Sequence, residues 1–282
     1  MDFDTLNAVL SRFDQDHDHF KKEMALLISR EKQTKTVVGV DLFEYSKMDE
    51  LKQFFVPFII NSIFNYALDE ISEDEDLIFK KSDISEIRRS KIDTGDGFFV
   101  ILNNPVEAFV FLIHFCAQFE TLQSRNSATG LMEICHSFFF RYSISTGPVY
   151  EYEGKKYGEA IINCSRIMSL DKLNRFLIDD ATFFWFYDNA NGLDTMRTNS
   201  RTEIVKYNNT DFNIEGKSMV FNIGKEDNSI KTLITQKIGT MQSKKDILDI
   251  YNVYLQVHVL LMKKEPVDLI VSIGNLNVSR FE

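Results

Sequence analysis

The order of apolar segments between residues 34 and 187 constrains the fold of this chain more than any other feature. Short runs rich in β-branched and aromatic residues predict strands, and longer runs with apolar residues at helical spacing predict helices. The expected strands are 36–41, 85–93, 98–102, 137–146 and 175–180, and the expected helices are 50–68, 104–122, 159–170 and 181–187. The first six elements follow the order βαββαβ, which predicts an α+β, ferredoxin-like domain with two helices on one face of an antiparallel sheet.

The flanking segments divide the chain into three expected parts. Residues 1–33 have apolar positions at helical spacing and are expected to form an N-terminal helical segment, followed by the main domain at 34–224. Residues 225–282 are expected to form a C-terminal extension, with an amphipathic helix at 242–263 and a strand at 267–274.

Two charged stretches are expected to face solvent. The acidic stretch 68–78 is interpreted as an exposed connection after the first long helix. The stretch 14–20 is rich in Asp and His, but its spacing matches no recognised ligand set. We therefore interpret it as the charged face of a helix rather than as a metal site.

Charge and cysteine content exclude several classes of protein. The formal net charge of −10 argues against a nucleic-acid partner, since that partner requires a clustered Lys/Arg surface. The three cysteines, Cys116, Cys135 and Cys164, are odd in number and lie in apolar surroundings, as reduced core residues do. The acidic N-terminus does not resemble a secretion signal, and the longest apolar runs are too short to span a bilayer. We expect a cytoplasmic protein with no membrane partner.

Two acidic residues stand at the ends of apolar strands. Asp41 follows a buried strand just before a loop and a helix, and Asp96 lies in the Gly95–Gly97 turn of a hairpin. Hairpin geometry alone explains an Asp-Gly turn. A carboxylate at the edge of a core must otherwise be paired or bind a metal, and the two strands are expected to be neighbours. Together with a helix N-terminus, the two carboxylates could therefore hold divalent metals and a triphosphate.

Four segments carry a resemblance to a known family. VVGVDLFEYS, IDTGDGFFVIL, FRYSISTGPVYEY and YGEAIINCSRIMSL resemble, in order and spacing, the conserved blocks of class III nucleotidyl cyclases. Within that family the chain is most similar to the bacterial pyrimidine cyclases of the Pycsar antiphage system. The resemblance covers about residues 34–224, which makes this part the expected catalytic domain.

The resemblance implies a homodimer with composite active sites at the subunit interface. Two Mg²⁺ or Mn²⁺ ions would be bound by Asp41, Asp96 and the backbone carbonyl of Leu42, and the loop from Phe43 to Ser46 would surround the phosphates. The other subunit would supply two cations: Arg166 would stabilise charge on the α-phosphate, and Lys217 is a looser match to a phosphate-binding lysine. Outside this context, Arg166 would be interpreted as an ordinary helix-surface residue.

Departures from the family pattern concern the base and the ribose. Ile92 and Lys155 occupy the positions of the two residues that recognise a purine, which argues against ATP and GTP. Tyr45 offers a hydroxyl near the base, although it can equally be a packed aromatic residue. Ile162 occupies the position of the ribose-orienting Asn, and Asn163 is displaced from it by one residue, about 100° around a helix.

These observations favour a pyrimidine nucleotide cyclase that converts UTP, or alternatively CTP, to the 3′,5′-cyclic monophosphate and pyrophosphate. The resemblance implies that the product signals phage infection to a separate effector. Two alternatives stay open: an adenylyl cyclase with unusual base contacts, and a cyclase-like module that binds nucleotide or only dimerises.

Overall fold

The structure is a computed structural model. It describes residues 32–75, 78–125, 138–152, 154–190, 196–199, 218–223, 232–243, 246–261 and 267–281, together with six helical positions between 8 and 26. Most of the expected N-terminal helix therefore lies outside the described residues.

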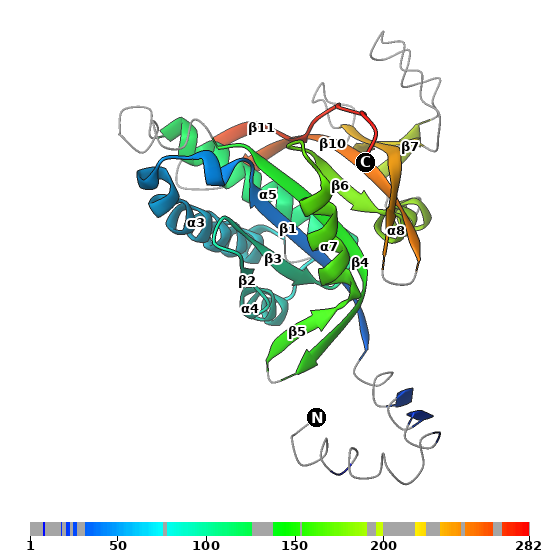
Figure 1. The fold of residues 1–282 in the computed structure, drawn as a ribbon. Helices are drawn as coiled ribbons and strands as arrows, with labels where there is room; N and C mark the ends of the chain where they lie inside the picture. Colours follow the sequence, from blue (N-terminus) through cyan, green and yellow to red (C-terminus); the bar gives the residue numbers. More distant parts are fainter. Residues whose placement is uncertain are drawn as a thin grey trace.

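Strands and helices are interspersed up to α8, and only strands follow among the described residues (Figure 1). In chain order they are β1 Gln33–Leu42, the 3-10 helix η1 Tyr45–Lys47, α3 Glu50–Asp74, α4 Lys81–Arg89, β2 Ile92–Asp93, β3 Gly97–Leu102, α5 Pro105–Arg125, β4 Phe140–Tyr152, β5 Lys155–Gly158, α7 Glu159–Leu170, β6 Phe176–Asp179, α8 Asp180–Ala190, β7 Met196–Asn199, β8 Ser218–Ile223, β9 Thr232–Gln242, β10 Ile247–Leu261 and β11 Val267–Gly274.

All of these strands belong to one sheet. Its order is β2-β3-β1-β4-β6-β10-β9-β8-β7, with β5 paired to β4 and β11 paired to β10. β1 is antiparallel to both β3 and β4, and β2 is antiparallel to β3. The first four strands and the helices α3 and α5 thus form the βαββαβ arrangement. The predicted α+β, ferredoxin-like class is confirmed.

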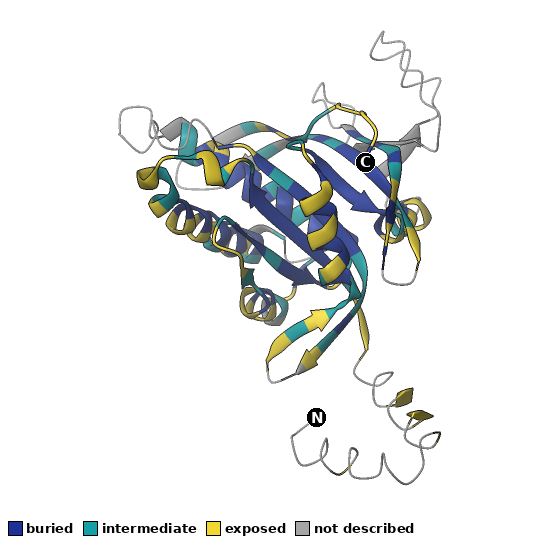
Figure 2. Ribbon diagram, in the orientation of Figure 1, coloured by how far each residue is buried: buried dark blue, intermediate teal, exposed yellow. Residues whose placement is uncertain are grey.

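Alternation along β1 assigns its two faces to different helices. Val38, Val40 and Leu42 are buried in the main core with α3 and α5. Val37 instead packs with residues of α7, and an added Cβ at Gly39 would meet Met168 of α7. In Figure 1, α7 accordingly crosses one face of the sheet while α3 and α5 lie behind it. Figure 2 shows the strands buried between these layers and the outer side of α7 exposed.

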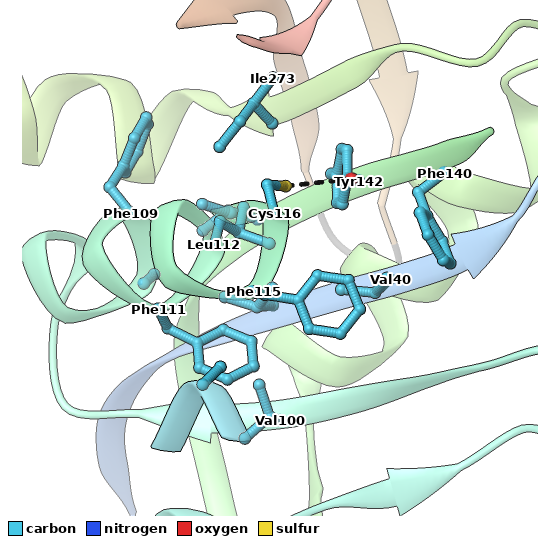
Figure 3. Close-up of a cluster of buried hydrophobic side chains, with 14 of the residues drawn as sticks. Val40, Val100, Phe109, Phe111, Leu112, Phe115, Cys116, Phe140, Tyr142 and Ile273 are labelled. Carbon is cyan, nitrogen blue, oxygen red and sulfur yellow. Dashed lines mark hydrogen bonds between the residues drawn. The ribbon is translucent and has the colours of Figure 1, made fainter. Parts of the chain in front are cut away.

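Phenylalanines of α5 contribute to the core behind the sheet. Phe111 and Phe115 project from this helix toward Val40 and Val100 on the sheet (Figure 3). Cys116 donates to the Tyr142 hydroxyl at 3.2 Å, and burial raises the pKa of its thiol to about 12. Cys116 and Cys164 are both free and buried, as expected of reduced core cysteines.

One described helix is long and apolar enough to cross a membrane by composition. It is the segment Pro105–Gln123 of α5, and 72% of its most apolar window is buried inside the protein. Asn104 caps this helix, since its side chain accepts from the Glu107 N–H at 3.1 Å.

Two predictions around α3 and α4 are wrong. The strand expected at 85–93 is mostly the helix α4, and only Ile92–Asp93 is a strand. Ile84 and Ile87 are buried at helical spacing there, and the Asp83 side chain accepts from the Lys80 N–H at 3.1 Å. The expected exposed connection 68–78 is largely the last part of α3, because buried Ile71 continues the apolar side of that helix.

A third prediction fails in the C-terminal extension. The helix expected at 242–263 is the strand β10, whereas the strand expected at 267–274 is confirmed as β11. Ile250, Tyr251, Asn252 and Val253 are all buried, because β10 runs between β6 and β9 with both of its faces covered. Burial on both faces removes the period-two pattern by which a strand is recognised.

Candidate active site

The register of β1 and β3 brings the hairpin turn to the end of β1. Asp41 lies opposite Gly97, and the Leu42 N–H donates to the Asp96 carbonyl at 3.0 Å. A Cβ added to Gly97 would lie 2.0 Å from the Val40 carbonyl oxygen, so only glycine permits this approach. The close approach of Gly97 to β1 therefore explains both the tight hairpin turn and the position of Asp96 beside Asp41.

The side chains of Asp41 and Asp96 are close enough to share a hydrogen bond, and their charges repel. Burial is the main reason why the pKa of Asp41 rises from 3.8 to about 6. Arg141 lowers this pKa, and Asp96 raises it further. By the alternation of β1, Asp41 points to the α7 face of the sheet.

Two converging carboxylates suit a hard divalent cation. Mg²⁺ and Mn²⁺ prefer carboxylate, carbonyl and water oxygens, and they normally keep several waters or substrate phosphate oxygens. Asp41, Asp96 and the carbonyl of Leu42 supply donors of this kind. Among the described residues no group of three or more His, Cys, Asp or Glu side chains gathers to hold a metal, so a cation bound by Asp41 and Asp96 would take its other ligands from the Leu42 carbonyl, water or substrate oxygens. The residues present thus fit the metals implied by the resemblance.

Sequence reasoning missed Arg141. It lies directly opposite Asp41 on β4, its Nε donates to Asp41 Oδ2, and its Nη1 donates to the Asp171 carbonyl at 3.0 Å. An arginine within the apolar run SFFFRYSIST was the available signal. Its partner could not be known without the strand register.

The loop after β1 borders an open cavity of about 590 Å³. Its lining comes from this loop, the start of α3 and two neighbouring segments: Phe43, Glu44, Lys47, Met48, Asp49, Lys52, Phe139 and Asn174. Lys47 pairs with Glu44 at 2.5 Å and Lys52 with Asp49 at 3.7 Å. The predicted phosphate loop therefore lies beside a cavity with two lysines at its wall, and Ser46 is exposed on the same loop.

The three expected base-pocket residues are not brought together in one chain. Ile92 lies opposite Phe99, which packs on the α7 face of the sheet that also carries Asp41. The Tyr45 hydroxyl donates to the Gln53 carbonyl at 3.1 Å, which favours the packed-aromatic alternative. Lys155 is exposed on β5, about 35 Å along β4 from the Asp41 level.

On α7, the expected site residues lie on different sides of the helix: Asn163 faces the sheet, whereas Ile162 and Arg166 face outward. Asn163 is buried, and its Oδ1 accepts from Ser243 Oγ at 3.0 Å. Ile162 and Arg166, one turn apart, are exposed on the outer side of the helix. Arg166 therefore points away from the sheet face that holds its own Asp41. Lys217 lies outside the described residues.

Comparisons with known proteins give structural likenesses only. No family model matches the chain, and no curated protein matches it. One similar solved structure is the catalytic core of a rhodopsin-guanylyl cyclase with converted specificity in complex with ATPαS, with 15% identity and a TM-score of 0.43 over 79% of this chain and 96% of that chain. Another is an adenylate/guanylate cyclase/hydrolase from Silicibacter pomeroyi, with 11% identity and a TM-score of 0.39 over 79% and 96%.

A bacterial light-regulated adenylyl cyclase has 12% identity and a TM-score of 0.44, and the match covers 89% of this chain and 64% of that one. All three proteins are described as nucleotide cyclases. At these identities and TM-scores the likenesses establish neither a family nor an activity for this chain. A functional assignment has to come from the residues that the fold brings together.

Proposed function

We propose that this chain is a metal-dependent nucleotide cyclase of the class III type. The observation that carries the proposal is the convergence of Asp41 and Asp96 at the end of β1, beside a loop that borders a cavity of about 590 Å³. The segments with family resemblance are 37–46, 92–102, 140–152 and 157–170, and the first three contribute Asp41, Asp96 and Arg141 to this point. The catalytic domain would span 34–224, as expected from the sequence.

The reaction would join the ribose 3′-oxygen to the α-phosphorus and release pyrophosphate. Two Mg²⁺ or Mn²⁺ ions, when bound, would lower the pKa of the 3′-hydroxyl and offset the charge of the triphosphate. Asp41, Asp96 and the Leu42 carbonyl would supply the protein ligands. The loop from Phe43 to Ser46 would surround the phosphates and bind them by the backbone N–H groups that follow Phe43, whose own N–H donates to the Phe139 carbonyl at 2.8 Å. Lys47 and Lys52 would contact phosphate by exchanging their present partners, Glu44 and Asp49.

A second copy of the chain would complete the site. Arg166 is exposed on the outer side of α7 and turned away from its own Asp41, which supports the homodimer with composite sites. The guanidinium of the partner's Arg166 would stabilise charge on the α-phosphate, and Lys217 would contact phosphate from the same side. This arrangement makes the isolated subunit inactive.

For the substrate we propose UTP, with CTP as the alternative. Ile92 offers no hydrogen bond to a purine edge, and Lys155 is distant from Asp41 within one chain. The cyclic product would act as a second messenger in antiphage defence through a separate effector, and both enzyme and effector would work in the cytoplasm.

A cyclase-like module without turnover is the second candidate. The buried hydrogen bond between Asn163 and Ser243 favours it, because Asn163 then cannot orient a ribose from the outer side of α7. Such a module would bind nucleotide or only dimerise, so turnover is what separates the two candidates.

The purified protein should be incubated with Mn²⁺ and each of the four ribonucleoside triphosphates in turn, and the products separated by chromatography. We expect a cyclic monophosphate from UTP or CTP, none from Asp96→Ala, and wild-type rates from Asp93→Ala. Asp93 is a matched control, since its carboxylate lies on the same hairpin, exposed and paired to Lys91 at 2.5 Å. Product from ATP alone would refute the pyrimidine assignment, and no product from any nucleotide would leave the binding module.

A further inference from the structure

Arg141 joins the Asp41 carboxylate to a loop on the far side of β4. Its Nε donates to Asp41 and its Nη1 to the Asp171 carbonyl at 3.0 Å. Because the guanidinium is planar and its donors diverge at fixed angles, the position of Asp171 sets the direction from which Arg141 meets Asp41. The orientation of Asp41 therefore depends on the loop between α7 and β6, residues 171–175.

A buried ion pair fixes this loop. Arg175 donates to Asp171 Oδ1 through Nε at 2.9 Å and through Nη2 at 2.6 Å, and the two side chains are 3% and 2% exposed. The remaining donor of Arg175, Nη1, reaches the Ser279 carbonyl at 2.8 Å. A buried guanidinium needs each of these partners, so the loop is tied to the last residues of the chain.

The C-terminal tail, Asn275–Phe281, is itself anchored at both ends. Asn275 Nδ2 donates to the Asn174 carbonyl at 2.8 Å, and its own carbonyl accepts from Asn252 at 2.8 Å. At the other end the Phe281 N–H donates to the Ile238 carbonyl at 3.1 Å. In Figure 1 the tail runs from β11 across the sheet to the end marked C.

The Phe281 side chain completes a small core of its own. It is 5% exposed and packs with Ile167, Leu177, Ile238, Met241 and Ile250. A Cβ added to Gly239 would come within 2.8 Å of the Phe281 carbonyl, so the tail lies directly on β9. Ile167 belongs to α7, one turn before the loop that holds Arg141.

We propose that the C-terminal tail, acting through Arg175 and Arg141, positions Asp41 to bind its divalent cation. The claim rests on the proposed function only in assigning a metal to Asp41. Arg141 and Phe281 are positioning residues, since each would act on the cation through Asp41. The chain of contacts runs Asp41, Arg141, Asp171, Arg175 and the tail, and every link is a described hydrogen bond or ion pair.

Two roles of Arg141, supplying positive charge near Asp41 and holding Asp41 in position, predict different effects of Arg141→Lys. Arg141→Lys retains the positive charge, but a single ammonium on a flexible chain cannot hold Asp41 and Asp171 in a fixed relation. Phe281→Ala removes the tail anchor and leaves every charge in place. If the tail acts through Arg141, both changes misorient Asp41 by the same route. Phe281→Ala should then cause no further loss of Mn²⁺ affinity in a chain that already carries Arg141→Lys.

The test is a titration of the nucleotide-free protein with Mn²⁺, in which electron paramagnetic resonance measures the Mn²⁺ that remains free. We expect Arg141→Lys and Phe281→Ala each to weaken binding by about tenfold, the low end of what outer-shell partners of metal ligands contribute. The double variant should be no weaker than Arg141→Lys alone, and Phe281→Leu should restore binding. Arg88→Lys is the control, because Arg88 also pairs with a carboxylate, that of Asp69 at 2.7 Å, but on α4 and α3 and at a more exposed position.

Wild-type Mn²⁺ affinity in Arg141→Lys would overturn the proposal, as would additive losses in the double variant. If Phe281→Ala lowers the unfolding temperature but leaves the Mn²⁺ affinity unchanged, the tail does not position Asp41. If the wild type binds Mn²⁺ but cyclises no nucleotide, the proposed function fails while the binding series still decides the positioning claim.

Discussion

His114 on α5 predicts that the protein loses stability in mildly alkaline solution. Its Nδ1 lies 3.5 Å from Oε2 of Glu70 on α3, and its Nε2 lies 3.1 Å from Oε1 of Glu75, which caps the C-terminus of α3. Gln118 also donates to Glu70, so these are the charged and polar groups that face the imidazole from the two helices. Burial alone would lower the pKa of His114, but the two carboxylates raise it from 6.5 to about 9.

The direction of this pH effect depends on whether the folded or the unfolded chain binds the His114 proton more tightly. The folded pKa of His114 lies above its ordinary value, so the protonated imidazole stabilises the folded chain below about pH 6.5, and this contribution disappears as the pH rises through about 9. With these two values, the free energy of unfolding should fall by about 2 kcal/mol between about pH 6.5 and pH 8.5. The pKa values of Asp41 and Asp179, each raised to about 6, lie below this window.

Urea unfolding followed by circular dichroism at several pH values in this window measures the loss. His114→Gln keeps a hydrogen-bonding side chain that does not titrate, and its stability should change little with pH. Glu75→Gln, which removes one of the two carboxylates, should give an intermediate slope. If His114→Gln loses as much stability over the window as the wild type, the linkage is assigned to the wrong residue.

Two further predictions concern the hairpin and the dimer. Gly97→Ala should destabilise the protein by about 1–3 kcal/mol in urea unfolding and reduce turnover, since the new Cβ would lie 2.0 Å from the Val40 carbonyl; wild-type stability would show that the hairpin can move away from β1. Mixing inactive Asp96→Ala and Arg166→Ala subunits should restore about a quarter of the wild-type rate, because half of the dimers would contain one intact composite site. A mixture that stays inactive would argue against sites shared between subunits.

The elements nearest the site were predictable because their patterns are local. α7 begins and ends where the sequence predicts, since its buried side repeats at helical spacing. The pattern of α4 resembles that of a strand because Ile84 and Ile87 are the only buried positions among the described side chains of this short helix. β10 was mistaken for a helix because both of its faces are covered, and no period then distinguishes the two structures.

The site itself was predictable only in part. Asp41 and Asp96 could be paired from the sequence, because strand order and a tight Gly-Asp-Gly turn place them side by side. Arg141 could not, since its contact with Asp41 depends on the β1–β4 register, and register is set by packing across the whole sheet. The inward orientation of Asn163 depends on Ser243, which is 80 residues away in the chain.

The central claim is that the β1–β3 register makes a metal site from Asp41 and Asp96. Its most direct test is calorimetric titration of the nucleotide-free protein with Mn²⁺, compared between the wild type, Asp96→Ala and the hairpin control Asp93→Ala. We predict saturable binding that Asp96→Ala weakens by at least about tenfold and that Asp93→Ala leaves unchanged. Equal Mn²⁺ affinity in the wild type and Asp96→Ala would contradict the account.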